Sequence, residues 1–374
     1  MSFFSAEPTR FARCPRPLAW VTVVGALAIL IWGLSVSFPP KPPPPPPAAE
    51  PETPSSGGTD IDFYETVVKR VHAGEGYYAV AAEELPKGGY PTRSVLNWRL
   101  PTYAWFFGIL PWIRIGQALL IGLSLWTLYL SVRFIRRETG GLPAIAGFVW
   151  LIGAMTWCVD GKSFLTQEVW AGVLVQLSLV SLGDGHRLRG VVAAVVGLLI
   201  RELVLPYVLL CLVMSVWQRR WREVLGWVVG LGLYAAYTWY HVIQVKAHTP
   251  AEETNYPSIW LCWGGMEFVL KTVRMNQLLI LAHPAIRACY FPFALLGLIG
   301  WRGETGFRIL FTSLGYSAAF LALGQPFNDY WGILLAPVLS MGAALAPWAI
   351  RDLYRQIRPK TLPQTASPVA VQSV

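Results

Sequence analysis

Long apolar runs alternate with short polar segments along most of the chain, and this pattern predicts its fold. Apolar runs, many of about 18 or more residues, recur along most of the chain, and a helix needs roughly 20 such residues to cross the hydrocarbon core of a membrane. We therefore predict an all-α protein, a polytopic transmembrane helical bundle of about ten spans. The predicted spans cover residues 18–38, 115–134, 142–159, 167–182, 190–205, 203–217, 224–242, 285–301, 308–324 and 331–349.

The polar segments carry arginine on alternate sides of these spans. Cytoplasmic loops of membrane proteins hold an excess of lysine and arginine. The segments that would share the cytoplasmic side contain Arg10, Arg13, Arg16, Arg133, Arg136, Arg137, Arg187, Arg189, Arg219, Arg220, Arg222, Arg302, Arg308, Arg351, Arg355, Arg358 and Lys360. The short loops of the other side add little beyond Lys162. Both termini are therefore predicted to lie in the cytoplasm.

Two further apolar segments, 101–113 and 268–281, interrupt this pattern. The first is too short to span a membrane, and the second carries Lys271, Arg274 and Asn276 in its middle. Counting either as a span would invert the charge pattern downstream. We expect both to be interfacial helices, with their aromatic residues at headgroup depth.

The pattern divides the chain into six segments. They are a cytoplasmic N-terminus (1–17), a first transmembrane helix (18–38), a proline-rich linker (39–58), an extracytoplasmic loop with interfacial helices (59–114), a transmembrane bundle (115–349) and a cytoplasmic C-terminal tail (350–374). The first run is too long for a typical signal peptide, and no A-x-A cleavage site precedes the prolines, so we interpret it as an uncleaved span. The linker favours an extended polyproline II spacer.

The extracytoplasmic loop opens with an amphipathic pattern over residues 59–73. Apolar residues from Phe63 to Val71 repeat at i, i+4 spacing and share one helix face. Thr59 and Asp62 fit a capping box, which gives Asp62 a structural task. The helix dipole also favours an acid at the position of Asp60, although no local motif requires it.

Composition agrees with a membrane protein and excludes several other classes. The chain is 54% hydrophobic and 14% charged, and its net charge of +9 lies in short loops, where it serves topology and lipid headgroup contact better than nucleic-acid binding. The five cysteines form no CxxC pair, so neither a disulfide framework nor a zinc site is indicated. No P-loop, Rossmann, HExxH or G-x-S-x-G motif occurs.

Charged and amide side chains recur at the predicted outer ends of the spans. Arg201 and Glu202 stand among apolar neighbours in the fifth span, where each buried charge costs roughly 2.5–3.5 kcal/mol on insertion scales. Because adjacent helix residues point about 100° apart, we expect the pair to face a cavity or other partners, not simply each other. Further candidates are Asn97, Arg99, Asp160, Lys162, Glu168, Asn328, Asp329 and Tyr330. Singly, each also fits a snorkelling or ordinary loop residue.

Short motifs resemble those of the GT-C class of membrane glycosyltransferases, which use polyprenyl-phosphate sugars. "DIDFY" (60–64) followed by "GEGYY" (74–78) resembles the D-x-x-x-Y then G-x-x-Y pattern of the mannosyltransferase-like branch. "NWRLP" (97–101) and the "RE" of Arg201 and Glu202 are similar to segments of other members of that class. The proline spacer departs from the usual close approach of this loop to the first span.

The resemblance implies a GT-C-like fold and transfer of a sugar from a polyprenyl-phosphate donor to an extracytoplasmic glycolipid, glycan or protein. Asp60 would be the general base, with Asp62 in reserve, and the reaction would invert the anomeric carbon. Arg201, with Arg99 or Lys162, would bind the donor phosphate. Substrate contacts would come from Tyr64, Asn97, Glu168, Glu202, Asn328 and Asp329. The expected location is the inner membrane of a bacterial cell.

Other functions stay open at this point. Asp60 and Asp62 leave a shared divalent cation open, although two carboxylates at one helix start are thin support for a metal site. A polytopic transporter would use Arg201 and Glu202 as an intramembrane site and would be indifferent to Asp60. A non-catalytic assembly subunit would tolerate changes at both places. The residues identify neither the sugar nor the acceptor.

Overall fold

The computed structural model describes residues 7–38, 60–249 and 262–358. Within these ranges the chain forms 14 α-helices and seven short 3-10 helices, and its β interaction is one isolated bridge between Cys262 and Leu323. The all-α prediction is therefore confirmed. The proposed linker 39–58 and the cap residue Thr59 lie outside the described residues.

Each of the ten predicted spans coincides with a helix. These helices are α1 (Arg16–Ser37), α5 (Ile113–Thr139), α6 (Gly141–Met155), α7 (Gln167–Gly183), α8 (Arg187–Ile200), α9 (Leu205–Trp217), α10 (Trp221–His248), α12 (Pro284–Gly300), α13 (Gly303–Ala322) and α14 (Gly332–Ile357). Among the described residues, four helical stretches are long and apolar enough to cross a membrane by themselves: Arg16–Ser37, Ile113–Thr139, Gly141–Cys158 and Phe327–Ile357. The chain is an integral membrane protein.

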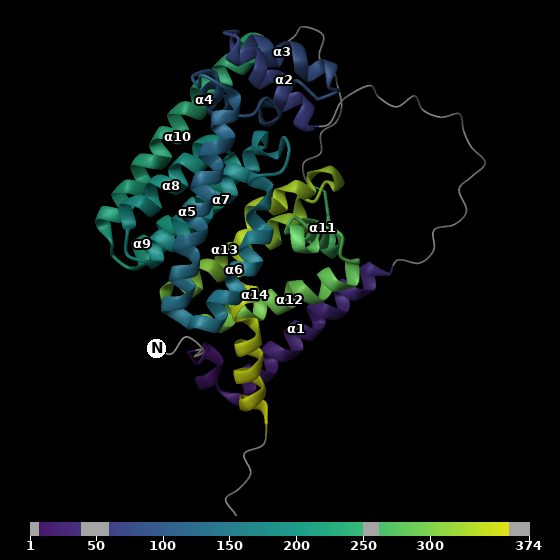
Figure 1. Ribbon diagram of the computed structural model, residues 1–374, viewed down its shortest axis with the longest axis vertical. Coiled ribbons are helices and arrows are strands. Elements are labelled where there is room, and N and C mark those ends of the chain that lie inside the picture. The colour runs from purple at the N-terminus through teal and green to yellow at the C-terminus, as the bar shows by residue number, and fades with distance from the viewer. Residues whose placement is uncertain (1–6, 39–59, 250–261, 359–374) are drawn as a thin grey trace, which may run out of the picture.

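The remaining helices are short: α2 (Asp60–His72), α3 (Tyr77–Lys87), α4 (Thr102–Gly108) and α11 (Gly265–Val273). The first three lie together at one end of the molecule, and the C-terminal end of α14 lies at the opposite end (Figure 1). The amphipathic prediction for α2 is confirmed, because Tyr64, Val67, Val68 and Val71 are all buried. They pack against α3 and α4.

The centre of the bundle is formed by α7 and α14. Every residue of α7 from Gln167 to Leu182 is buried, so this helix is surrounded by protein on all sides. Close helix packing holds the C-terminal half together, since a Cβ at Gly297 of α12 would lie 1.8 Å from the carbonyl oxygen of Gly342 in α14. Small residues at such crossings let transmembrane helices approach closely.

Several of the arginine-rich loops contact one another. Near the N-terminus, the Thr9 amide donates to Asp352 Oδ2 at 2.8 Å, and Arg302 Nη2 donates to the Thr9 carbonyl at 3.2 Å. Ion pairs continue this set of contacts between Arg137 and Asp184, Arg187 and Glu223, and Arg220 and Glu304. The face of the membrane that these loops occupy stays a prediction.

The segment 268–281 corrects one expectation, because it does not form a single interfacial helix. Helix α11 ends at Val273, and a separate 3-10 turn, η6 (Gln277–Leu279), follows. Asn276 causes the interruption: its side-chain oxygen accepts the Leu278 amide and so caps the second turn. Its Nδ2 donates to the Trp150 carbonyl at 3.0 Å, which fixes the bend against α6.

Candidate active site

The helix that was expected to carry Arg201 in its interior ends one residue earlier. Helix α8 stops at Ile200, and Arg201 is extended, with φ −144° and ψ 117°, before the 3-10 turn η5 (Glu202–Val204). Pro206 explains the break, because in a continuous helix its ring would clash with the carbonyl of Glu202 and its missing N–H would remove a hydrogen bond. Near the start of α9 the same proline is well tolerated.

The break lets Arg201 and Glu202 pair with each other, and Arg201 also has a further partner, as expected. Arg201 Nη1 lies 2.5 Å from Glu202 Oε1, and Arg201 Nε lies 2.7 Å from Glu168 Oε1 at the start of α7. The side chains of Arg201 and Glu168 are 0% exposed and that of Glu202 is 20% exposed. Arg201 Nη2 is buried and has no hydrogen-bond partner.

Arg99 connects this buried group to helix α2. Its Nε lies 3.2 Å from the Tyr64 hydroxyl of α2, and its Nη2 lies 3.3 Å from the Tyr330 hydroxyl. Nη1 lies 3.9 Å from Glu202 Oε1. The structure thus brings together six residues that the sequence singled out, Tyr64, Arg99, Glu168, Arg201, Glu202 and Tyr330. We call these six the arginine cluster.

The backbone of Arg99 is strained, and Tyr77 supports it. Arg99 has φ +43°, a conformation that costs a residue with a side chain of order 1–3 kcal/mol. The hydroxyl of Tyr77 donates to the Arg99 carbonyl at 2.8 Å and also contacts the carbonyl of Trp98. Tyr77 and Trp98 are both buried. This tyrosine of the "GEGYY" motif therefore fixes the peptide from which the Arg99 side chain extends.

A cavity of about 330 Å³ lies beside the arginine cluster. Tyr64 and Tyr330 belong to both, so their side chains join the cavity to the guanidinium of Arg99. Asp60 lines the cavity and accepts a hydrogen bond from the Tyr90 hydroxyl. The other lining residues are Ile61, Trp157, Ser163, Thr166, Met275, Phe327, Asp329 and Ile333.

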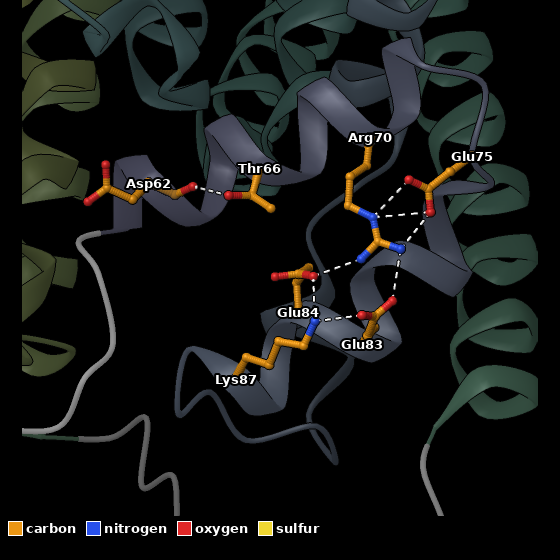
Figure 2. A network of polar contacts seen from close by, with 7 residues as sticks. All are labelled: Asp62, Thr66, Arg70, Glu75, Glu83, Glu84 and Lys87. Carbon is orange, nitrogen blue, oxygen red and sulfur yellow. Dashed lines mark hydrogen bonds and ion pairs between the residues drawn. The ribbon is translucent and has the colours of Figure 1, made fainter.

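Asp62 and Lys162 lie apart from the arginine cluster. Lys162 Nζ is 2.5 Å from Glu65 Oε2 and 3.6 Å from Asp62 Oδ1, and its side chain is half exposed. Figure 2 shows Asp62 at the start of α2, where its backbone oxygen accepts the Thr66 hydroxyl. Hydrogen bonds from Lys162 and Lys69 hold the pKa of Glu65 below its usual value. A phosphate role for Lys162 and a catalytic role for Asp62 stay predictions.

The remaining candidates have local partners of their own. Asn97 Nδ2 donates to the Pro91 carbonyl at 2.8 Å, and Asp329 forms an ion pair with Arg274. Asn328 is buried, and its Nδ2 has no hydrogen-bond partner. Substrate contact by these residues is not tested by the geometry and stays a prediction.

Comparison with known proteins identifies the fold. The crystal structure of ArnT from Cupriavidus metallidurans bound to undecaprenyl phosphate, a GT-C glycosyltransferase, matches with a TM-score of 0.51 and 15% identity over 89% of this chain. The chain has a GT-C fold. The apo state of the same ArnT matches with a TM-score of 0.49 and 18% identity over 91% of this chain. These matches cover 60% and 62% of the ArnT chains, so this chain spans less than two thirds of their length.

Protein-family models and curated proteins add no further likeness. No family model matches the sequence, and no curated protein matches it. The likeness to ArnT therefore identifies the GT-C fold, and the chemistry has to be argued from the residues of this chain.

Sequence reasoning did not assign a role to several residues of this candidate site. Tyr90 and Trp157 carry no local signal, because their partners lie 30 or more positions away in the chain. For Tyr330 and Arg274 the signal was weak, since each is one of several polar residues in its segment. Among the described residues, no group of three or more His, Cys, Asp or Glu side chains is arranged to hold a metal ion.

A second cavity of about 330 Å³ lies between α1, α12 and α14, away from the arginine cluster. Its lining is apolar, as Leu27, Phe293 and Leu353 illustrate, and it includes no charged residue. Catalysis of a polar reaction needs charged or hydrogen-bonding groups at the reacting atoms. We therefore assign the candidate active site to the cavity beside Arg99.

Proposed function

We propose that this protein is a membrane glycosyltransferase that moves a sugar from a polyprenyl-phosphate donor to an extracytoplasmic acceptor. The fold is that of ArnT, whose crystal structure contains bound undecaprenyl phosphate. One observation carries the proposal. The carboxylate of Asp60 and the arginine cluster meet at a shared wall, formed by Tyr64 and Tyr330.

The arginine side of this wall suits the donor phosphate. Arg99 Nη2 has a tyrosine hydroxyl as its hydrogen-bond partner, and Arg201 Nη2 has none. Guanidinium groups bind phosphate through charge-assisted hydrogen bonds. Glu168 and Glu202 balance the two arginines, which keeps the buried charges tolerable before the donor binds. Arg99, the more exposed arginine, makes the first contact, and Arg201 supports it.

The cavity side suits proton transfer. As the acceptor oxygen attacks the anomeric carbon, a C–O bond forms there and the bond from that carbon to the phosphate oxygen breaks. The acceptor proton passes to Asp60, and the bonding electrons leave with polyprenyl phosphate. The phosphate leaves as an anion, so the reaction needs positive charge at the leaving group but no general acid. A single displacement of this kind inverts the anomeric carbon.

Transfer by the purified full chain in lipid nanodiscs tests the proposal, with a radiolabelled polyprenyl-phosphate hexose as donor and lipid acceptors as substrates. We expect Asp60→Asn to lower the transfer rate roughly 10²–10⁴-fold by loss of the base. Arg99→Ala should lower it roughly 10²–10³-fold by loss of charge stabilisation.

Two further variants sharpen this test. Asp62→Asn removes the reserve carboxylate, which stands on the same helix. Glu267→Gln removes an exposed carboxylate of α11 whose partner is Lys271, and it controls for an isosteric change away from the site. Undiminished transfer by Asp60→Asn would remove Asp60 from the mechanism. Solute flux that is insensitive to Asp60→Asn, without sugar transfer, would favour a transporter instead.

A further inference from the structure

The cavity beside the arginine cluster has an unbalanced charge. Asp60 and Asp329 are its charged lining residues, and both are acidic. Arg274 forms an ion pair with Asp329 and offsets its charge. Asp60 accepts its hydrogen bond from Tyr90, which is a neutral donor. Among the described residues, therefore, Asp60 faces the cavity without a cationic hydrogen-bond or ion-pair partner.

The nearby cations are already engaged with other carboxylates. Lys162, next to the lining residue Ser163, pairs with Glu65 and Asp62. Arg99 donates to the hydroxyls of Tyr64 and Tyr330 and approaches Glu202. Within the lining, Asp60 is thus the carboxylate whose charge no cation offsets by direct contact, and a second negative charge placed close to it would be repelled.

The rest of the lining suits an uncharged, hydroxyl-bearing ring. Trp157 and Phe327 supply aromatic surface, while Ser163 and Thr166 supply hydroxyl groups. Small-molecule sites commonly combine apolar walls with a few polar groups, in volumes of about 300–1,000 Å³. The faces of a sugar ring present C–H bonds and its edges present hydroxyl groups. The faces can therefore pack on the aromatic side chains, and the edges can form hydrogen bonds with the hydroxyl groups of the lining.

We propose that this cavity receives the sugar of the donor and selects for a sugar that carries no negative charge. The inference rests on the proposed function and adds the class of sugar to it. The phosphate stays on the arginine side of Tyr64 and Tyr330, and the ring lies on the side of Asp60. A hexuronic acid would place its carboxylate near Asp60, in a cavity whose basic neighbours are already paired.

Equilibrium binding to the full chain in nanodiscs tests this selection with three lipids. The probes are polyprenyl phosphate, a polyprenyl-phosphate hexose and the matching polyprenyl-phosphate hexuronic acid. We expect the hexose lipid to bind at least as tightly as polyprenyl phosphate, and the hexuronic acid lipid to bind roughly tenfold or more weakly than the hexose lipid.

Two variants show whether the carboxylates of the cavity lining determine the ratio of the affinities for the hexose lipid and the hexuronic acid lipid. Asp329→Asn leaves the positive charge of Arg274 without its partner beside the cavity, so the hexuronic acid lipid should gain affinity relative to the hexose lipid. Asp60→Asn should likewise raise the affinity for the hexuronic acid lipid relative to the affinity for the hexose lipid. Glu267→Gln, which also removes a carboxylate from a cation in α11 but lies outside the lining, should leave the ratio unchanged.

The ratio of the two affinities in the wild-type protein tests the inference even if a variant fails to fold. Equal affinity for the hexose and hexuronic acid lipids, with binding of polyprenyl phosphate intact, would overturn the inference and leave the proposed function standing. Failure of all three lipids to bind the folded wild-type protein would instead contradict the proposed function. A ratio that is tenfold in the wild type but unchanged in both cavity variants would also overturn the assignment to this cavity.

Discussion

Two arginines of this protein have similar partners in different surroundings. Arg70 of α2 contacts Glu75, Glu83 and Glu84 around the start of α3, as Figure 2 shows. Arg201 contacts Glu168 and Glu202 between α7 and α9. The Arg70 side chain is 26% exposed and that of Glu83 is 50% exposed, whereas Arg201 and Glu168 are both 0% exposed.

This difference in burial separates a structural role from a functional one. Exposed ion pairs contribute little free energy relative to hydrated charges and are screened by salt. The Arg70 network therefore orients α3 on α2 but adds little to the stability of the fold. Removing two charges from water costs several kcal/mol per ion, and an apolar pair of similar size is often at least as stable. A buried pair beside a cavity is therefore better explained by what it binds than by stability alone.

Glu168→Ala gives the largest expected effect, because it leaves Arg201 buried with one fewer carboxylate. Breaking a buried pair by removing one partner costs about 3–5 kcal/mol. We expect a marked loss of thermal stability in detergent, measured as the apparent Tm. The double variant Glu168→Ala with Arg201→Met should recover stability but not sugar transfer. A single variant as stable as the wild type would show that burial does not distinguish the two arginines.

The pair formed by Glu168 and Arg201 illustrates what could be predicted from the sequence and what could not. Hydropathy places α7, which carries Glu168, and α8, which ends just before Arg201, since each predicted span coincides with a helix. Glu168 and Arg201 are 33 positions apart, however, and no i, i+3 or i, i+4 rule joins residues at that separation. Their contact depends on the break after Ile200 and on how α7 packs against α8, which are both tertiary features.

The same limit holds for the site as a whole. The D-x-x-x-Y and G-x-x-Y motifs identify Asp60, Tyr64 and Tyr77 as a group worth testing, but spacing does not give their tasks. The task of Tyr77 follows from the positive φ of Arg99, which no pattern in the sequence indicates. Lys162 illustrates the converse, because its position in a predicted outer loop suggested a phosphate ligand, whereas in the structure it forms ion pairs with carboxylates of α2.

Tyr77→Phe should have a smaller effect, which acts on sugar transfer through Arg99 alone among the residues of the arginine cluster. The change removes a hydroxyl that holds the Arg99 carbonyl and keeps the ring. Loss of a hydrogen bond of about 1–1.5 kcal/mol lowers kcat/KM for the donor roughly tenfold. Tyr78→Phe is the matched control, since the neighbouring hydroxyl contacts His241 instead. Equal losses in the two variants would indicate a general packing defect and not a specific support of Arg99.

Arg70→Gln tests the exposed network and should change little. Two of its three partners, Glu75 and Glu83, are about half exposed, and Lys87 also contacts Glu83 and Glu84. We expect an apparent Tm close to that of the wild type at physiological salt and full sugar transfer. A loss as large as that of Glu168→Ala would mean that the orientation of α3 matters to the bundle as much as the buried pair does.

The smallest expected effect is the response of this network to acid. Hydrogen bonds from Lys87 and then Arg70 lower the pKa of Glu83 to about 2, from an ordinary value of 4.5. Because the pKa of Glu83 is lower in the folded state, its contribution to stability is complete above about pH 4.5 and is lost as the pH falls toward about 2. The apparent Tm of the wild type should therefore approach that of Glu83→Gln over this interval. A difference between the two that stays constant from about pH 5 to about pH 2 would show that the network contributes through packing and not through charge.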